Sequence, residues 1–294
     1  MDTSNIRKRL ILSGHGVWVN RISYYKATKK WLHLRNPKTW SEKLFWLNEY
    51  WQPEEKSICA DKYRVRDWVA QKGYPDILLQ LLGVYDKAED IVFEDLPNRF
   101  VLKCNHGCAC NVIVEDKSKL DIPEARRKLN GWLKRDYSLA YNEAHYHNIP
   151  PKIICEQFLP VNSYADVVDF KIHCFNGIPR WIGICYDRSK DATNQKEMIY
   201  SPEWKRLMYL KGDRADDGKW LDRPKNLDKM LEIAKAFSKD FPYVRVDLYS
   251  VGEIVFFGEL TFTPSGNMPE DEYTEDVATI AGNYLDLSKV KRTR

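Results

Sequence analysis

Residues 244–261 read VRVDLYSVGEIVFFGELT, and this stretch decides the fold. Two runs of alternating apolar and polar residues, Val244 to Tyr249 and Ile254 to Thr261, flank a short turn, a pattern typical of a β-hairpin. The side chains predicted to face the core are Val244, Val246, Leu248, Ile254, Phe256 and Leu260. The opposite face would then carry Arg245, Asp247, Glu259 and Thr261.

This polar face has the composition of a magnesium site. Asp247 and Glu259 would lie close together if the two strands pair with their apolar sides on the same face. Neighbouring carboxylates repel each other, and a hard cation such as Mg²⁺ relieves that repulsion while keeping positions for water and phosphate oxygens. On spacing alone, a solvated ion-pair face is an equally good interpretation.

Two upstream segments add polar groups. In a predicted strand over 168–175, Asp169, Lys171 and His173 alternate with apolar residues, so they would line either water or a ligand. Lys103 ends another apolar strand and opens a loop of small residues, an arrangement that suits phosphate. That loop also holds Cys104, His106, Cys108 and Cys110, but these alternate without the paired spacing of zinc ligands.

The rest of the chain predicts an α+β protein, with helices up to about Leu82 and strands interleaved with helices afterwards. The first clear helix is predicted to be capped by Ser41. Further strands are predicted over 99–104, 112–115, 152–158 and 180–186, and further helices over 123–137, 227–239 and 271–285. The segment from Asp187 to Lys219 predicts a long loop with one short helical piece.

Composition excludes several classes of protein. With 294 residues, 44% hydrophobic and 30% charged, the chain can bury a core without disulfides and is neither disordered nor collagenous. Its apolar runs are shorter than a membrane span, which needs roughly 20 residues. The apolar run near the N-terminus is also too short for the core of a secretory signal. Seven cysteines, an odd number, fit reduced thiols. These features predict a cytoplasmic protein.

Charge is uneven along the chain. Residues 1–50 hold ten Lys or Arg against three Asp or Glu, a local charge of +7 in a chain whose net charge is +4. The same segment holds Trp18, Trp31, Trp40 and Trp46. Such a mixture could face anionic lipid head groups or an anionic glycan, or it could be a solvated helical face with its tryptophans in the core.

Several motifs follow each other in a recognisable order: Asp61-Lys62-Tyr63, Phe100 to Lys103, Glu156 to Leu159, Asp169-Phe170-Lys171, and Arg245-x-Asp247 with Glu259-x-Thr261. In order and spacing they resemble the ATP-grasp superfamily. Pro37 to Lys43, Asn105-His106-Gly107 and Gly258 to Pro264 are similar to motifs of its teichuronopeptide-biosynthesis (TupA-like) branch. The resemblance covers roughly Asn36 to Leu285.

The resemblance implies an ATP-grasp fold, in which two α+β lobes with antiparallel sheets grip a nucleotide after a helical N-terminal region. It suggests a basic, Trp-rich helical region over 1–58, an N-terminal and central lobe over 59–155, and a C-terminal lobe with the metal site over 156–290. ATP and Mg²⁺ are the implied cofactors.

The resemblance also implies individual roles. Lys62 and Lys103 would hold the phosphates, Lys171 would be a further phosphate contact, and Asp169 would lie near the ribose. Arg245 would lie over the transferring phosphoryl group, and Asp247, Glu259 and Thr261 would hold Mg²⁺. The loop residues predicted to fold over the phosphates include Asn105, His106, Gly107 and Asn111, and those predicted at the adenine edge are Glu156, Gln157, Phe158 and Leu159.

Two departures from the superfamily pattern stand out. Thr261 replaces the usual Asn, and it is a weaker metal ligand that could act through water. Cys108 and Ala109 occupy a loop that is commonly richer in Gly and Ser, so closure of that loop could be altered.

The implied activity is ligation of a carboxylate to an amine through an acyl phosphate, with ADP as a product. In this branch the carboxylate would be a uronic acid of a surface polysaccharide and the amine that of an amino acid. Candidate substrate residues are Arg180, Arg188, Ser265, Gly266 and Asn267, with Arg188 also a candidate catalytic residue. Alternatives are a nucleotide-dependent kinase or glycosyltransferase of the same pathway and a non-catalytic scaffold. A scaffold predicts loss of the charged residues, and all of them are present.

Overall fold

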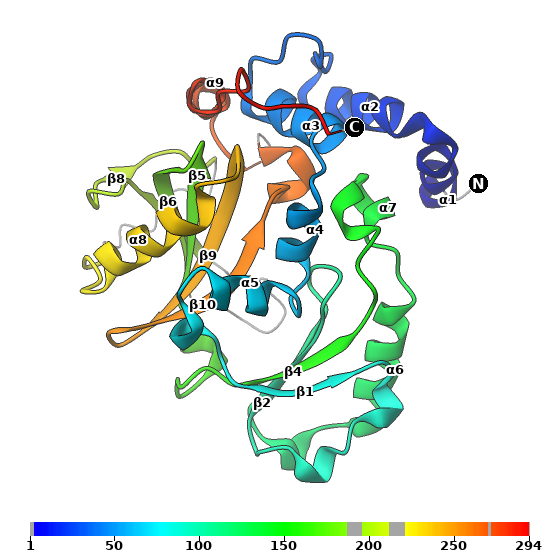
Figure 1. Ribbon diagram of the computed structural model, residues 1–294, viewed down its shortest axis with the longest axis vertical. Coiled ribbons are helices and arrows are strands. Elements are labelled where there is room, and N and C mark those ends of the chain that lie inside the picture. The colour runs from blue at the N-terminus through cyan, green and yellow to red at the C-terminus, as the bar shows by residue number, and fades with distance from the viewer. Residues whose placement is uncertain (1–2, 187–195, 212–220, 270–271, 294) are drawn as a thin grey trace.

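The computed structural model describes residues 3–186, 196–211, 221–269 and 272–293 (Figure 1). Its α-helices are α1 (Thr3–Leu10), α2 (Gly16–Thr28), α3 (Trp40–Tyr50), α4 (Glu54–Ala60), α5 (Val65–Gln71), α6 (Ile122–Leu133), α7 (Ser138–Tyr141), α8 (Leu227–Ser238) and α9 (Glu275–Tyr284). Its strands are β1 (Leu81–Tyr85), β2 (Phe100–Cys104), β3 (Asn111–Val114), β4 (Ile153–Gln157), β5 (Asp169–Phe175), β6 (Ile178–Tyr186), β7 (Lys196–Tyr200), β8 (Arg206–Leu207), β9 (Tyr243–Val251) and β10 (Ile254–Thr261).

The first sheet has four strands in the order β1-β4-β2-β3, and every neighbouring pair is antiparallel. Alternate residues of β2, among them Phe100 and Leu102, are fully buried against Leu129 of α6. Helix α6 begins at the cap Asp121, whose side chain accepts from the Glu124 N–H, and it lies along the outer side of the sheet (Figure 1). β1 was not predicted from the sequence.

The second sheet has six strands in the order β10-β9-β5-β6-β7-β8, and it is also antiparallel throughout. As predicted, Val244, Val246 and Leu248 of β9 are fully buried. Helix α8 packs on them with a stripe of apolar side chains at helical spacing, which comprises Met230, Ile233, Ala234 and Phe237. Two antiparallel sheets with packed helices confirm the α+β prediction.

Helix α3 is anchored in the core of the second sheet. Trp40 is fully buried, with ring centroids 5.3 to 5.9 Å from those of His173, Phe175, Trp181, Tyr243 and Tyr273. The prediction that His173 lines water or a ligand was therefore wrong, because this aromatic cluster encloses it. The helix is capped by Thr39 in a reciprocal arrangement with Glu42, and not by Ser41.

The final hairpin departs from strict alternation. Its register shifts between Phe257 and Glu259, and at the intervening Gly258 a Cβ atom would stand 2.8 Å from the carbonyl oxygen of Asp247. One extra residue reverses the two sides of a strand. Val255 and Phe257 are consequently buried while Ile254 is 58% exposed, so the prediction that Ile254 and Phe256 share the core face with Leu260 was wrong.

The segment predicted as a long loop contributes two strands among its described residues, β7 and β8, which extend the second sheet. Within the part of the chain that the structure describes, no helix is long and apolar enough to cross a bilayer. The predicted region boundaries at residues 58 and 155 stay predictions.

Candidate active site

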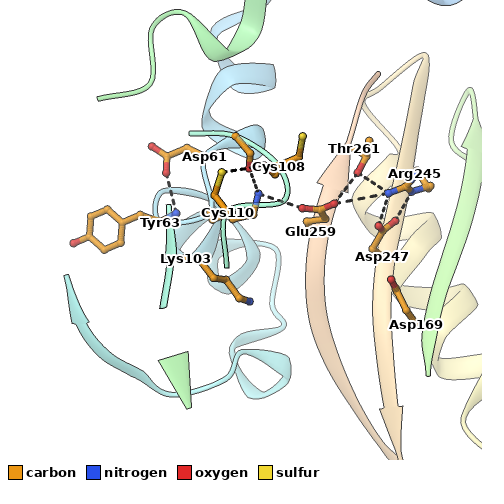
Figure 2. Close-up of polar contacts among 12 residues, drawn as sticks. Asp61, Tyr63, Lys103, Cys108, Cys110, Asp169, Arg245, Asp247, Glu259 and Thr261 are labelled. Atoms are coloured by element: carbon orange, nitrogen blue, oxygen red, sulfur yellow. Dashed lines mark hydrogen bonds and ion pairs between the residues drawn. The ribbon is translucent and has the colours of Figure 1, made fainter. Parts of the chain in front are cut away.

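The bulge at Gly258 brings the polar side chains of the final hairpin together. It places Glu259 opposite Asp247 and Thr261 opposite Arg245, which confirms the predicted proximity of the two carboxylates. Arg245 donates two hydrogen bonds to Asp247, from Nε to Oδ1 at 2.7 Å and from Nη2 to Oδ2 at 2.6 Å. The Thr261 hydroxyl accepts from Arg245 at 3.1 Å and donates to Glu259 at 3.4 Å (Figure 2).

Strand β5 adds a cation and a third carboxylate to this face. Lys171 pairs with Asp247 across the sheet, and its Nζ lies 2.6 Å from Asp169 Oδ2 and 3.1 Å from Asp247 Oδ2. Both Asp side chains are buried. Asp169, Lys171, Arg245, Asp247, Glu259 and Thr261 form what is called the acidic face below.

Lys62 reaches the acidic face from the opposite side. Its Nζ lies 3.2 Å from Glu259 Oε2 and donates to the Gly107 carbonyl at 2.7 Å. Its backbone N–H also donates to the Asn105 carbonyl. Figure 2 shows Glu259 between the Arg245–Asp247 pair and the loop that carries Cys108 and Cys110. Lys62 therefore joins the loop of the first sheet to the hairpin of the second.

Lys103 lies on β2 of the first sheet and forms an ion pair with Glu156. Its Nζ is 2.7 Å from Glu156 Oε2, while Glu156 Oε1 is 2.7 Å from Nη1 of Arg66. The sequence interpretation missed Arg66. One signal in the sequence could have identified Arg66. It is a basic residue four positions after Lys62, and side chains four residues apart in a helix are neighbours.

A cavity of about 240 Å³ opens between the two sheets. The predicted site residues that line it are Lys62, Lys103, Asn111, Gln157, Phe158, Leu159, Asp169, Lys171, Asp247 and Glu259. Apolar side chains such as Val101 and Ile113 line it as well, together with Cys108 and Ala109. The cavity thus combines an apolar wall with a charged one.

The loop over 105–111 holds its first two side chains inside the protein. Asn105 donates to Asp61 Oδ1 and to the Pro150 carbonyl, and His106 Nε2 lies 3.2 Å from the Arg135 carbonyl oxygen. Both are buried, so these two residues shape the loop and their side chains do not line the cavity. Gly107 packs against Tyr137, whose ring would be 2.5 Å from a Cβ at that position.

The predicted substrate residues are not gathered at the cavity. The guanidinium of Arg180 lies 4.4 Å from the ring centroid of Tyr284 on α9, outside the cavity lining, because β6 carries it away from the acidic face. Arg188 lies outside the described residues.

Ser265, Gly266 and Asn267 form a tight turn after β10 in which all three have positive φ. The Gly266 N–H already donates to the Thr263 carbonyl, so the predicted backbone donor at that position is occupied.

Opposite charges outweigh burial for Glu259 and Lys171 of the acidic face, but not for Asp247. Burial raises the pKa of Glu259, but the charges of Lys62 and Arg245 outweigh it and lower that pKa to about 2. Burial lowers the pKa of Lys171, yet Asp169 and Asp247 outweigh it and raise the pKa above its ordinary value. For Asp247, burial prevails over Arg245 and Lys171 and raises the pKa.

The donor set fits Mg²⁺. Asp247, Glu259 and Thr261 offer oxygen atoms only, which a hard cation prefers. Among the described residues, no group of three or more His, Cys, Asp or Glu is arranged to hold a metal. Two carboxylates with remaining positions left for phosphate and water are the usual form of a nucleotide-linked magnesium site.

Comparison with known proteins identifies relatives of the chain. A family model described as TupA-like ATP-grasp matches residues 42–286. No curated protein matches the sequence.

Among solved structures, the chain is similar to D-alanine–D-alanine ligase from Bacillus anthracis, with 15% identity and a TM-score of 0.46 over 77% of this chain and 63% of that one. It is also similar to an L-amino acid ligase from Bacillus licheniformis, with 19% identity and a TM-score of 0.45 over 78% of this chain and 50% of that one. The chain spans less than two thirds of the length of either protein.

Proposed function

The chain belongs to the TupA-like ATP-grasp family, and from this premise we propose that it is an ATP-dependent carboxylate–amine ligase that releases ADP. The observation that carries the proposal is the cavity between the sheets, where Asp247 and Glu259 face Lys62 and Lys103. Phosphoryl transfer needs carboxylates to bind a metal and cations to bind phosphates, and this cavity has them on opposite walls.

The cavity suggests how ATP lies. The apolar wall formed by Val101, Ile113 and Phe158 suits a planar base, and the backbone of 157–159 would meet its edge. Lys62, Lys103 and Lys171 would contact phosphates, and Asp169 would approach the ribose. Of these cations, Lys103 is tied to Glu156 and Lys171 to Asp169, so both are held in place before nucleotide binds.

Mg²⁺ would be held by Asp247, Glu259 and Thr261, where it would neutralise charge on the phosphate oxygens. Arg245 lies among these residues and would stabilise the transferring phosphoryl group. Arg188 stays a predicted substrate residue.

The reaction has two steps. An oxygen of the substrate carboxylate attacks the γ-phosphorus of ATP, the bond to the β–γ bridging oxygen breaks, and ADP leaves. The resulting acyl phosphate is then attacked by the amine, the acyl C–O bond breaks, and phosphate leaves as the amide forms. Because a carboxylate is a poor electrophile at neutral pH, activation must come first.

For the substrates, we infer a uronic acid of a surface polysaccharide, such as a capsule, and an amino acid as the source of the amine. This inference comes from the family branch. A nucleotide-dependent kinase would instead transfer phosphate without any amine and leave a stable phosphorylated product.

The test is calorimetric titration of ATP with and without Mg²⁺, on the wild type and on Glu259→Gln. We expect Mg²⁺-dependent binding in the wild type and its loss in the variant, which removes one charge at nearly constant shape. Glu253→Gln, on the exposed turn of the same hairpin, is the matched control. Absence of ATP binding by the wild type would refute the proposal. Binding would justify screening uronic acids and amino acids for ADP release.

We also propose that the protein works in the cytoplasm and contacts the inner face of the membrane through α1, α2 and the following turn. Residues 3–41 contain nine Lys or Arg and no Asp or Glu. Trp40 and Trp46 are buried, but Leu12, Trp18 and Trp31 are exposed by 67, 56 and 59%. Exposed tryptophans in a segment with an excess of cations suit anionic head groups.

Sedimentation with phosphatidylglycerol vesicles would test this contact. We expect the wild type to sediment with them and not with phosphatidylcholine vesicles, and the Trp18→Ser/Trp31→Ser variant to stay in solution. Ile254→Ser changes an equally exposed apolar side chain on the distant hairpin turn and serves as the control. Unchanged sedimentation of the double Trp variant would contradict the proposal.

A further inference from the structure

A second cluster of buried ionisable groups has no role in the function proposed above. Its buried members are Lys56 on α4, Glu143, His145 and, after β10, Thr263. Tyr146, which belongs with His145 to the short helix η6 (Ala144–Tyr146), is partly buried. Lys56 is 1% and Glu143 7% exposed. The Thr263 hydroxyl donates a hydrogen bond to the Glu143 carboxylate.

This cluster adjoins the acidic face. Thr263 follows two residues after Thr261, whose hydroxyl contacts both Arg245 and Glu259. Burial raises the pKa of Tyr146 well above its ordinary value, the negative charges of Glu143 and Glu259 add to that rise, and Arg245 opposes it. Because Thr263 is hydrogen-bonded to Glu143, the cluster lies at the C-terminal end of β10, next to the strand positions of Glu259 and Thr261.

Cys108 gives a second link between the two regions. Its side chain lines the nucleotide cavity, and both Glu143 and Glu259 contribute to raising the pKa of its thiol, after burial as the largest cause. The charge of Glu143 thus acts on a side chain of the cavity wall.

The cluster is not arranged for stability alone. Within the described residues, neither ring nitrogen of His145 has a hydrogen-bond partner, although the residue is 1% exposed. Lys56 Nζ is 5.6 and 5.9 Å from the ring centroids of Trp51 and Phe262, and the charge of Glu143 opposes the lowering of its pKa by burial. Buried polar groups without partners are unfavourable. Where they persist beside a reaction centre, a functional role is the usual reason.

We propose that Glu143 and Tyr146 form the subsite for the attacking amine and that Glu143 takes up a proton from it. The proposal rests on the ligase reaction described above. An ammonium group would sit against the Glu143 carboxylate with the Tyr146 hydroxyl beside it. Lys56, on the other side of Glu143, would keep the emptied subsite close to neutral.

The proton balance is as follows. The ammonium form of the substrate loses one proton to the Glu143 carboxylate, and the freed lone pair forms the C–N bond to the acyl carbon. The acyl C–O bond then breaks, and the departing phosphate takes the second nitrogen proton and leaves as hydrogen phosphate. Glu143 returns its proton to solvent before the next turnover.

The surroundings of Glu143 suit this role. Burial raises its pKa to about 7, and the Thr263 hydrogen bond and the charges of Lys56 and Arg7 limit the rise. A proton acceptor works best when its pKa is near the operating pH. The neighbouring His145 does not compete for the proton, because burial and the Lys56 charge hold its pKa well below the ordinary value.

The test compares two nucleophiles on Glu143→Gln, which keeps the shape and the hydrogen-bonding oxygen. D-glucuronate and D-galacturonate serve as carboxylates, and ADP release is measured with an equimolar mixture of amino acids or with hydroxylamine. Hydroxylamine is largely unprotonated at neutral pH and needs no base. We expect the amino-acid-dependent rate to fall by about 100-fold or more and the hydroxylamine rate to change by less than about threefold.

Thr263→Val removes the hydrogen bond that limits the pKa of Glu143. We expect it to move the acidic limb of the amino-acid-dependent pH–rate profile to higher pH, an effect that a merely structural role would not produce. Glu253→Gln is the control for both variants. Equal loss with both nucleophiles in Glu143→Gln, or no loss with either, would overturn the proposal.

A measurement of amino-acid binding distinguishes failure of this proposal from failure of the ligase assignment. If neither uronic acid supports ADP release, saturation-transfer NMR of the amino-acid mixture with the Mg²⁺·ATP-loaded protein still tests the subsite. We expect amino-acid signals in the wild type and their loss in Glu143→Gln, while calorimetry gives unchanged ATP binding. Absence of amino-acid signals in an ATP-loaded wild type would refute the subsite alone.

Discussion

Two clusters of partly or fully buried charged side chains lie side by side in this protein, and the loss of water has opposite outcomes in them. On the acidic face, the pKa of Glu259 is lowered to about 2 and that of Lys171 is raised. In the neighbouring cluster, burial lowers the pKa of Lys56 to about 7 and raises that of Glu143 to about 7. The same kind of ion pair is thus driven toward its charged form in one place and toward its neutral form in the other.

The number and geometry of partners explain the difference. Glu259 has Lys62 at 3.2 Å and Arg245 at 3.8 Å, and Lys171 has two carboxylates within 3.1 Å. Lys56 has no such contact, and only the more distant charge of Glu143 opposes its desolvation. For Glu259 and Lys171 the close counter-charges outweigh the loss of water, whereas for Lys56 one distant counter-charge does not. Asp247 is the exception on the acidic face, because its burial prevails over the charges of Arg245 and Lys171. A permanently charged site suits phosphate and metal, and a site poised near neutrality suits proton transfer.

The largest effect is expected from Asp247→Asn, which breaks the charged network at its centre. The substitution leaves Arg245 and Lys171 buried with fewer opposite charges, and breaking a buried ion pair from one side costs about 3–5 kcal/mol. We expect the free energy of unfolding, measured by urea denaturation, to fall by that amount.

The control for Asp247→Asn is Asp228→Asn, where the carboxylate is 79% exposed and pairs with Arg223 on the surface. Its unfolding free energy should stay within about 0.5 kcal/mol of the wild type. Similar losses for both variants would mean that burial does not set the strength of these pairs.

A smaller effect concerns the pH dependence of Glu143→Gln. The folded-state pKa of Glu143 is raised from 4.5 to about 7, so between these values the folded protein holds a proton that the unfolded chain has released. Stability therefore falls as pH rises through this window, by about 1.4 kcal/mol per pH unit and about 3 kcal/mol in all.

Glu143→Gln lacks this titration. We expect the unfolding free energy of the wild type, relative to that of the variant, to decline from pH 4.5 to 7 and to be flat above. Taking the difference cancels every titration that the two proteins share. A flat difference across this window would show that Glu143 is ionised in the folded state, like Glu259.

The sequence predicted the acidic face better than the cluster beside it. Alternation alone placed Asp247 and Glu259 on neighbouring strands and one polar face. Lys103 was predicted from its position at the end of an apolar strand, and Lys62 came from the resemblance to a family. Alternation could not reveal the bulge at Gly258, because a glycine in a strand leaves the pattern readable in either register. The exposure of Ile254 was therefore missed.

Lys56 and Glu143 could not be found from pattern because each stands among polar residues in a segment that is typical of a protein surface. Lys56 follows Glu54 and Glu55 at the start of a short helix, and Glu143 lies between a one-turn helix and η6. Their burial results from long-range packing of α4 and η6 against the end of β10, which no local sequence window contains. The burial of the four N-terminal tryptophans could not be predicted from the sequence either, since two are buried and two are exposed.

The smallest effect is expected from Lys56→Met, which replaces the buried cation by an apolar side chain of similar length. At about pH 10, where Lys56 is uncharged in the folded protein, the unfolding free energies of the two proteins should differ by no more than about 1 kcal/mol. The folded-state pKa of Lys56 is lowered from 10.5 to about 7, so the unfolded chain binds more protons between these values and wild-type stability rises with pH there. Relative to Lys56→Met, the wild type should therefore gain stability from pH 7 to 10, measured by urea denaturation. A large loss at pH 7 with no such gain would place Lys56 with the permanently charged groups of the acidic face.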